Sequence, residues 1–243
     1  MGAPVNLCNK FMLFSHISIG GGVTGIETII SAFDNIQKKL KKIKKKPKFK
    51  KITFAVIDKN PENIPGGVAY GVPTARYGYF NNPIRLSPIK FSSWLTKKEN
   101  KKKIIKYLMN HGGYSGKDWI EKNKKNLLSP KTKKFRELYI PRAIFNLWME
   151  EKFILLMSNM KKVSKKFSIN FNILFFKGEV VGIRYKKDYC QIIFKNNSYQ
   201  KLKYNIYKNA FKKLKFTPVK KAYDPIFSFS QSVCLGLPPP RQL

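Results

Sequence analysis

A glycine-rich turn near the start of the chain separates a short apolar segment from an amphipathic one. The turn spans residues 20–25 and reads Gly-Gly-Gly-Val-Thr-Gly, a G-x-G-x-x-G pattern. Residues 11–19 before it are apolar and rich in β-forming side chains, which is typical of a buried strand. Residues 23–40 after it carry apolar side chains at helical spacing. This order of strand, glycine turn and helix predicts the opening of a dinucleotide-binding βαβ unit.

Each glycine of the turn has a separate physical role in this interpretation. The first permits the tight turn, the second lets a pyrophosphate approach the backbone, and the third lets the helix pack closely on the strand. The helix N-terminus adds unpaired amide groups and a positive dipole end, both of which favour phosphate. A merely structural glycine turn is the alternative. The cofactor-binding residues predicted here are Gly20, Gly21, Gly22, Thr24 and Gly25.

A second apolar segment, residues 52–57, ends at Asp58 and predicts the second strand of the unit. An acid at this strand end accepts hydrogen bonds from a ribose diol and disfavours a 2′-phosphate, so FAD or NAD is expected rather than NADP. Asp58 follows Gly25 by 58 − 25 = 33 residues, more than the usual spacing of about 20. The lysine-rich stretch 38–51 accounts for the excess. An exposed strand-end aspartate without a ligand is the alternative.

The remaining pattern predicts an α/β protein. Residues 60–90 are rich in Gly, Pro and Asn and predict an ordered functional loop. Helical patterns follow at 91–95 and 103–109, then a polar, loop-like stretch with one short helix over 111–134. The longest helical candidate covers 136–163.

Beyond this helix the apolar period changes to two, which indicates strands. Residues 170–176 predict one strand, and 179–185 and 189–194 predict an antiparallel hairpin. Residues 195–221 are lysine-rich and unassigned, and 231–236 predict a last strand. We therefore expect one domain over residues 1–243, with a parallel sheet, flanking helices in a Rossmann-like arrangement, a small hairpin, and lysine-rich insertions near 38–51 and 195–221.

Several short segments make a resemblance specific. They are Pro65-Gly66-Gly67-Val68-Ala69-Tyr70-Gly71, Asn81-Asn82-Pro83, Leu86-Ser87, Trp94-Leu95 and Tyr139-Ile140-Pro141-Arg142. With the glycine turn and Asp58, they resemble the N-terminal FAD/NAD(P)-binding domain of a bacterial flavoprotein family that includes FAD-dependent urate hydroxylases and aspartate N-monooxygenases. Asn81 stands where that family usually has leucine. Residues 177–183 resemble its adenine-contacting strand, and 233–236 its closing strand, with Cys-Leu in place of the usual Ala-Thr.

The resemblance implies a flavin-dependent oxidoreductase or monooxygenase with FAD as cofactor, NAD(P)H as reductant and a small-molecule substrate that the sequence does not identify. It implies that Gly67, Tyr70 and Asn82 lie towards the flavin, that Val180 lines the adenine and that Gly236 ends the closing strand. Arg142 would neutralise a phosphate or a substrate acid, or form a structural salt bridge. No catalytic acid, base or nucleophile stands out, and no second G-x-G-x-x-G is present. A truncated, inactive relative is therefore the first alternative.

The chain carries 49 Lys and Arg against 13 Asp and Glu, a formal net charge of +36. Such a surplus has two explanations, a codon bias that favours lysine or a polyanion partner such as nucleic acid or anionic lipid. Cations spread over the surface favour the first, and a single basic face with aromatic side chains favours the second. No zinc-finger or RNA-recognition pattern is present, so a nucleic-acid-binding protein is the weaker alternative.

Other features bound the setting of the protein. Cys8, Cys190 and Cys234 form no CxxC pair, so neither a zinc site nor a disulfide framework is expected. The first 14 residues lack the basic start of a signal peptide. No apolar run of about 18 residues occurs, so no membrane span is expected. The expected location is cytoplasmic.

Overall fold

The computed structural model describes residues 12–43, 47, 49–71, 78–128, 133–185, 190–202 and 227–229. The chain forms two compact units. The sheet unit comprises residues 1–20, 27–61 and 158–243, and the helical unit comprises residues 21–26 and 62–157. A single domain was expected from the sequence. The two long helices, α1 (Val23–Lys42) and α8 (Arg142–Phe167), each contribute residues to both units.

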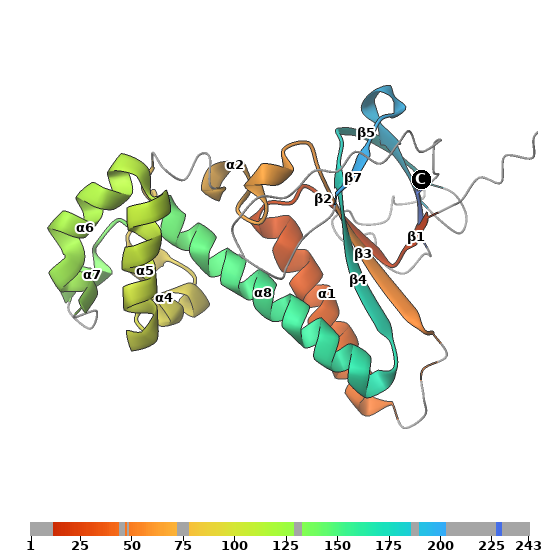
Figure 1. Cartoon of the computed structure of the whole chain (residues 1–243), viewed down its shortest axis with the longest axis horizontal. Helices are drawn as coiled ribbons and strands as arrows, with labels where there is room; N and C mark the ends of the chain where they lie inside the picture. The colour runs from red at the N-terminus through yellow and green to blue at the C-terminus, as the bar shows by residue number, and fades with distance from the viewer. Residues whose placement is uncertain are drawn as a thin grey trace, which may run out of the picture. The chain divides into compact units, whose positions relative to one another are not determined.

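The sheet unit is built on three parallel strands (Figure 1). They are β2 (His16–Ile19), β3 (Lys51–Asp58) and β4 (Asn170–Lys177), paired in the order β2-β3-β4. A fourth strand, β7 (Gln200–Leu202), pairs antiparallel with β4. The strands predicted over 52–57 and 170–176 are thereby confirmed, and the fold class is α/β with a parallel sheet flanked by helices.

The strand predicted over residues 11–19 is interrupted at Ser15. The structure divides it into β1 (Met12–Phe14) and β2, and the Ser15 amide donates to the Thr53 carbonyl at 2.8 Å. β1 pairs in parallel with β8 (Phe227–Phe229), which lies late in the chain. The glycine turn therefore follows β2, which pairs with β3, whereas the separate segment β1 pairs with β8.

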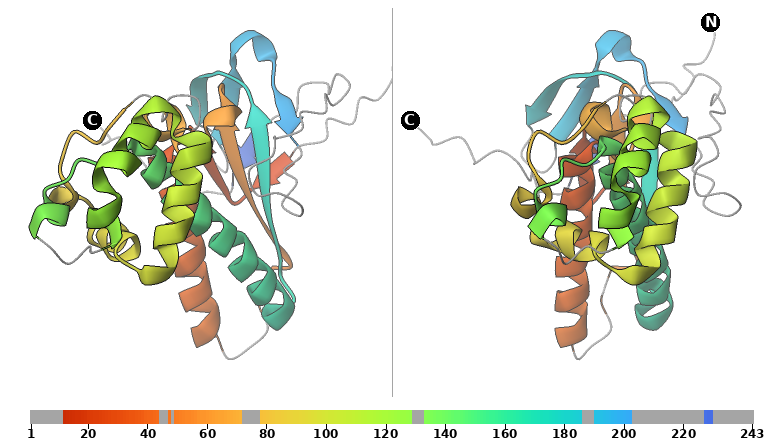
Figure 2. Two further views of the ribbon diagram at one scale, coloured as in Figure 1. Left: turned by 60° about the vertical axis from the view of Figure 1, so that its left-hand side comes forward. Right: turned by 90° about the vertical axis from the view of Figure 1, so that its left-hand side faces the viewer.

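Different elements pack against the two faces of the sheet. The edge of the Phe33 ring from α1 meets the face of Phe171 of β4, with ring centroids 5.3 Å apart. The opposite face packs against the antiparallel hairpin of β5 (Val180–Tyr185) and β6 (Cys190–Phe194) (Figure 2). The buried side chains there are Phe14, Ala55, Ile57, Phe176, Ile192 and Phe194. The predicted hairpin is confirmed, and it supplies two of these six side chains, Ile192 and Phe194.

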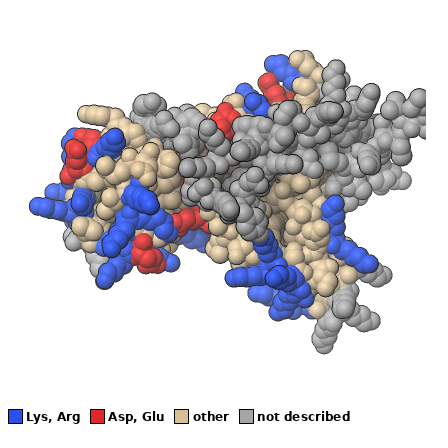
Figure 3. Space-filling model, viewed as in Figure 1, with Lys and Arg blue, Asp and Glu red and all other residues tan. Residues whose placement is uncertain are grey.

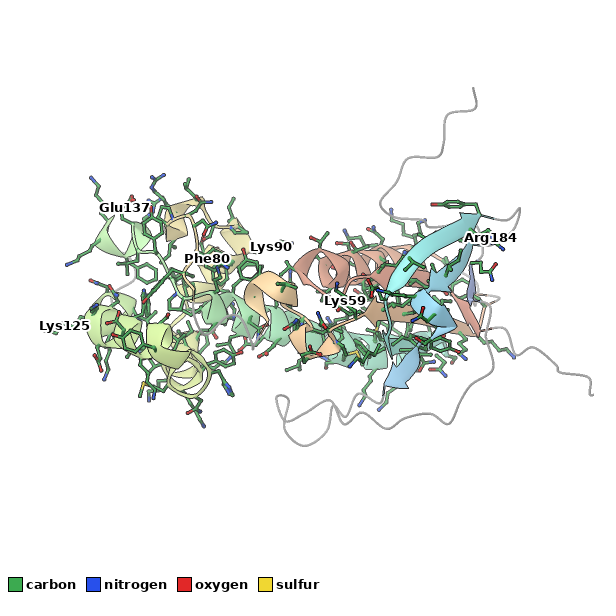
Figure 4. The ribbon with its side chains drawn as sticks, turned by 90° about the horizontal axis from the view of Figure 1, so that it is seen from above. Lys59, Phe80, Lys90, Lys125, Glu137 and Arg184 are labelled. Carbon is green, nitrogen blue, oxygen red and sulfur yellow. The ribbon has the colours of Figure 1, made fainter. Side chains whose placement is uncertain are left out.

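The helical unit contains five shorter helices in addition to its parts of α1 and α8, among the residues described. They are α2 (Gly67–Tyr70), α4 (Ile89–Leu95), α5 (Lys98–His111), α6 (Gly113–Leu128) and α7 (Lys133–Arg136). Its core is aromatic: Phe80 packs against Phe91 and Phe145, with centroids 5.9 and 5.4 Å away (Figure 4). The segment 60–90 contributes α2 and two short 3₁₀ turns, η1 (Pro61–Asn63) and η2 (Ile84–Leu86).

The prediction of a loop with one short helix over 111–134 was wrong. Residues 113–128 form α6, a helix of 16 residues, and buried Trp119 and Ile120 anchor it. Gly116 approaches α5 so closely that an added Cβ would lie 3.1 Å from the Leu108 carbonyl oxygen. Tertiary packing, rather than helix propensity, stabilises this segment. The predicted helix over 136–163 begins later, at Arg142, because Pro141 forms a bridge with Tyr79.

Candidate functional site

The carboxyl ends of the three parallel strands meet at one edge of the sheet unit. Ile19 of β2 is level with Ile57 of β3, and Asp58 is level with Lys177 of β4. The Gly20 amide donates to the Ile57 carbonyl at 2.7 Å, and the Gly178 amide donates to the Asp58 carbonyl at 3.0 Å. The chain therefore leaves β2 and β4 alongside the end of β3. In open α/β sheets this is the edge at which ligands bind.

Gly20 requires glycine for its backbone conformation. Its φ is +93°, a region that L side chains rarely adopt, and among the described residues no atom beyond Gly20 and its chain neighbours lies within 4 Å of where a Cβ would be. The Ser18 hydroxyl donates to the Gly20 carbonyl at 2.9 Å and fixes the turn. Helix α1 begins at Val23, three residues later. The strand, turn and helix predicted around the glycines are therefore present, and the space over the first glycine is open.

Asp58 is the last residue of β3 and is half-buried. Its carboxylate Oδ1 accepts a hydrogen bond from the Asn60 amide at 2.7 Å. This bond fixes the orientation of the carboxylate at the sheet edge, next to the residue that holds Gly20. The same bond also gives Asp58 a local structural role, which was the alternative interpretation from the sequence.

Val180 has a visible packing role. It is the first residue of β5, pairs with Phe194 of β6 and packs against the hairpin core. The neighbouring Gly178 lies so close to the Phe194 ring that an added Cβ would be 2.7 Å from ring carbon Cδ1. The segment after β4 is therefore held at the carboxyl edge. Gly236, with the predicted strand 231–236, lies outside the described residues.

In the helical unit, two glycines of the sequence motifs meet backbone to backbone. Gly67 has φ of +66°, and a Cβ added to it would lie 2.9 Å from the Gly22 Cα. The turn closes on itself, because the Gly71 amide donates to the Gly67 carbonyl at 2.7 Å. The second glycine of the G-x-G-x-x-G pattern is therefore in contact with the Gly66–Gly71 turn. In the same unit Gly21 is buried, Gly25 is half-buried and Thr24 is exposed.

The other residues expected near a flavin have different surroundings. The Tyr70 ring lies against Phe80 and Phe145, with centroids 5.4 and 4.8 Å away, so it belongs to the aromatic core. Asn82 is exposed. Arg142 donates from Nε to the Tyr79 carbonyl at 2.9 Å and from Nη2 to Asn81 Oδ1 at 3.2 Å. These bonds join the start of α8 to the segment before η2 and favour a structural role for Arg142.

A buried polar cluster in the helical unit was missed by the sequence analysis. Asn146 Nδ2 of α8 donates to Glu150 Oε1 at 2.6 Å and to the Tyr107 hydroxyl of α5 at 2.9 Å. Burial raises the pKa of Glu150 to about 8, and it also raises the pKa of Tyr107. Asn146 and Glu150 stand four residues apart within the apolar stripe of a long helix. That placement of polar side chains was the available signal.

The basic side chains are not evenly mixed with acids. Residues 35–57 and 152–178 contain no Asp or Glu. The starts of β3 and β4, which follow α1 and α8 in the chain, lie together in the sheet unit, since the Asn170 amide donates to the Lys50 carbonyl at 2.8 Å. Figure 3 shows lysines gathered there without acidic neighbours. This basic end comprises the exposed residues Lys38, Lys39, Lys41, Lys42, Lys50, Lys51, Lys161, Lys162, Lys165 and Lys166.

No family model, curated protein or solved structure matches the chain. Within the described residues, His, Cys, Asp and Glu side chains form no group of three that could hold a metal ion. In the same part of the chain, no helix is long and apolar enough to cross a membrane. The functional argument therefore depends on the geometry of the sheet edge and of the glycine turns.

Proposed function

We propose that this chain binds the ADP part of FAD at the carboxyl edge of its parallel sheet, as the cofactor-binding portion of a flavin-dependent oxidoreductase. The observation that carries the proposal is the turn at Gly20, which has a positive φ, open space above it and a hydrogen bond to the end of β3. The pairing order β2-β3-β4 also supports a Rossmann-like arrangement, because the strand ending in Asp58 lies directly beside the glycine strand.

In this proposal the parts of the cofactor have separate partners. Backbone amides of the loop from Gly20 to Gly25 and the N-terminus of α1 bind the diphosphate. The Asp58 carboxylate accepts hydrogen bonds from the adenosine ribose, and the segment at Val180 lies beside the adenine. Bound FAD would supply the redox chemistry, while the chain supplies position and electrostatics. Reduction by NAD(P)H and action on a small-molecule substrate belong to the same proposal.

Competition between nucleotides tests which half of FAD the chain recognises. We expect ADP to compete with FAD for the purified protein, whereas FMN, which lacks the adenosine, does not compete. Asp58→Ala should weaken FAD binding by roughly tenfold or more, because it removes a charge-assisted hydrogen bond worth about 1.5–3 kcal/mol. Glu121→Gln, at an exposed position of α6, is the matched control and should leave FAD binding unchanged. Competition by FMN equal to that by ADP would contradict the proposal.

The basic end favours a second candidate, a surface for single-stranded nucleic acid. Exposed Phe49 lies among the lysines, and the Lys166 ammonium lies 5.6 Å from the centroid of the Phe167 ring. Lysines for phosphates and aromatic rings for bases are the two elements of such surfaces. In the helical unit, by contrast, acids do lie beside cations: Lys103 pairs with Glu151 at 2.6 Å and Lys122 with Asp118 at 2.8 Å.

Matched lysine substitutions distinguish a selected surface from general charge. Retention on immobilised single-stranded DNA should weaken steeply with salt. Four lysine-to-glutamine changes at the basic end should reduce this retention more than four such changes in the helical unit. The first set is Lys161, Lys162, Lys165 and Lys166, and the second is Lys98, Lys102, Lys106 and Lys117. Equal losses from the two sets would contradict a dedicated surface and favour codon bias as the origin of the charge.

A further inference from the structure

The buried cluster of the helical unit is in contact with the Gly66–Gly71 turn. A Cβ added to Gly66 would lie 2.5 Å from Asn146 Oδ1, so the asparagine rests directly on the glycine backbone. Asn63 abuts the same turn, since a Cβ added to Gly71 would lie 2.8 Å from Asn63 Oδ1. All of these contacts leave no room for a methyl group. The position of Asn146 therefore determines where the turn can lie.

The contacts continue from this turn to the dinucleotide loop. Gly67 follows Gly66 directly, and its Cα lies against Gly22, as close as glycine allows. Asn146 in turn is held by Glu150 Oε1 at 2.6 Å. A continuous series of contacts within the helical unit thus leads from Glu150 through Asn146, Gly66 and Gly67 to Gly22. Close-packed contacts of this kind transmit displacement, because the interior has little free volume.

We propose that Glu150 and Asn146 are positioning residues for the glycine loop, and that the loop binds a dinucleotide best while Glu150 is protonated. This inference rests on the proposed function, because Gly22 is expected to face the pyrophosphate. The protonated carboxyl is neutral and fits its buried place between α5 and α8. An ionised carboxylate there needs hydration or a new partner, since Oε2 has no hydrogen-bond partner among the described residues.

The ionisable groups around Glu150 do not offer that compensation. From α5, the Tyr107 hydroxyl donates to Oε1 at 3.4 Å, and the His111 ring lies against Tyr107 at a tilt of 44°, with centroids 4.9 Å apart. The adjacent Glu151 adds a second negative charge, and its own partners are Lys103 of α5 at 2.6 Å and the Trp94 indole of α4 at 2.9 Å. The Lys103 ammonium is thus already bound to Glu151, and the Lys152 ammonium lies over the Trp148 ring, 4.5 Å from its centroid.

The direction of the pH effect follows from these surroundings. With its pKa raised to about 8, Glu150 carries a proton at neutral pH and loses it in mildly alkaline solution. The hydrogen bonds from Asn146 and Tyr107 to Oε1 favour the ionised form, but burial outweighs them. In this proposal, hydration of the unpartnered Oε2 on ionisation moves the Glu150 side chain with Asn146 and, through the turn, Gly22. Binding and protonation must be reciprocal, so a dinucleotide bound above this pKa draws a proton onto Glu150.

Affinity and proton uptake are the two readouts. We expect ADP to bind the whole chain roughly fivefold or more weakly at about pH 9.5 than at about pH 6.5, and calorimetry in two buffers of different ionisation heat to show proton uptake on binding near the pKa. In Glu150→Gln, affinity should stay at the low-pH value and proton uptake should vanish. The control Glu121→Gln, at an exposed position, should behave as the original protein does.

The outcomes separate the inference from the proposed function. Tight ADP binding without pH dependence or proton uptake would overturn the inference and leave the proposed function intact. A pH dependence of ADP affinity that persists unchanged in Glu150→Gln would overturn the inference as well, since another group would then be responsible. Absence of ADP binding at every pH would overturn the proposed function, and the inference with it.

Discussion

Gly67→Ala tests whether the close contact between the two glycine motifs is structural. Two costs apply to an alanine there. A left-handed backbone with φ of +66° costs an L residue about 1–2 kcal/mol. The new methyl carbon would lie 2.9 Å from the Gly22 Cα, well inside the optimal separation of about 3.5–4.0 Å. Because the Gly22 Cα belongs to the backbone, it can move away from the new methyl group only if the chain shifts, which costs about 1–3 kcal/mol.

Gly67→Ala should therefore lower the free energy of unfolding by about 2–5 kcal/mol. Two matched glycines separate the contributions. Gly20→Ala carries a positive φ of +93° but meets open space, so it should lower the same free energy by only about 1–2 kcal/mol. Gly182→Ala in β5 meets only the Ile193 side chain, at 3.6 Å. That substitution should be neutral or stabilising by up to about 1 kcal/mol.

Urea unfolding of the three variants and the original protein measures these differences directly. The midpoint should fall most for Gly67→Ala, less for Gly20→Ala and not at all for Gly182→Ala. Equal destabilisation by Gly67→Ala and Gly20→Ala would refute the reasoning, because only backbone strain would then matter. ADP affinity should fall in both of the first two variants, as each displaces part of the loop.

Three further substitutions test separate parts of the structure. Phe176→Ala removes a fully buried ring that meets Phe14 edge-on at 5.7 Å, and urea unfolding should show a loss of about 3–5 kcal/mol. Arg142→Lys should cost about 1 kcal/mol through lost hydrogen bonds and leave ADP affinity unchanged; a tenfold weaker affinity would indicate a phosphate contact instead. Glu150→Gln should remove a pH dependence of stability. The folded pKa of Glu150, about 8, exceeds its ordinary value of 4.5, so the folded state holds more protons between these pH values. The original protein therefore loses up to about 5 kcal/mol of stability between about pH 4.5 and 8, and the variant does not. Parallel urea titrations at several pH values check the last difference, and identical pH profiles would contradict it.

The sequence could predict the elements whose apolar period is strong. Residues 52–57 form a nearly continuous apolar run that is buried, residues 170–176 carry mostly apolar side chains, and both strands occur where predicted. The hairpin at 179–194 has an alternating pattern and short polar connection, and it too is present. The break at Ser15 could not be predicted, because it depends on which neighbours β1 and β2 each find along their edges.

Helix α6 was missed because its first turn is rich in glycine and its apolar side chains are sparse. Its sequence begins with two glycines within four residues, and its lysines and asparagines show little periodicity. What stabilises it is burial of Trp119 and the fit of Gly116 against Leu108. Both require the position of α5, which local sequence patterns do not contain. Tertiary packing here determines the secondary structure rather than the reverse.

The candidate site was predictable where backbone chemistry limits the residue type. The positive φ at Gly20 and the strand-end position of Asp58 follow from the glycine pattern and the apolar strands. The contact between Gly22 and Gly67 was not predictable, since it joins segments about 45 residues apart through packing alone. Glu150 was missed for a related reason, because its pKa is raised by burial that only the packed helices create.

The visible absorption spectrum of the purified chain after incubation with FAD and removal of free cofactor tests the central claim most directly. The account predicts flavin absorption bands that remain with the protein and are displaced by ADP. It also predicts that Gly20→Ala together with Asp58→Ala abolishes them. A folded protein that stays colourless after the same incubation would contradict the account.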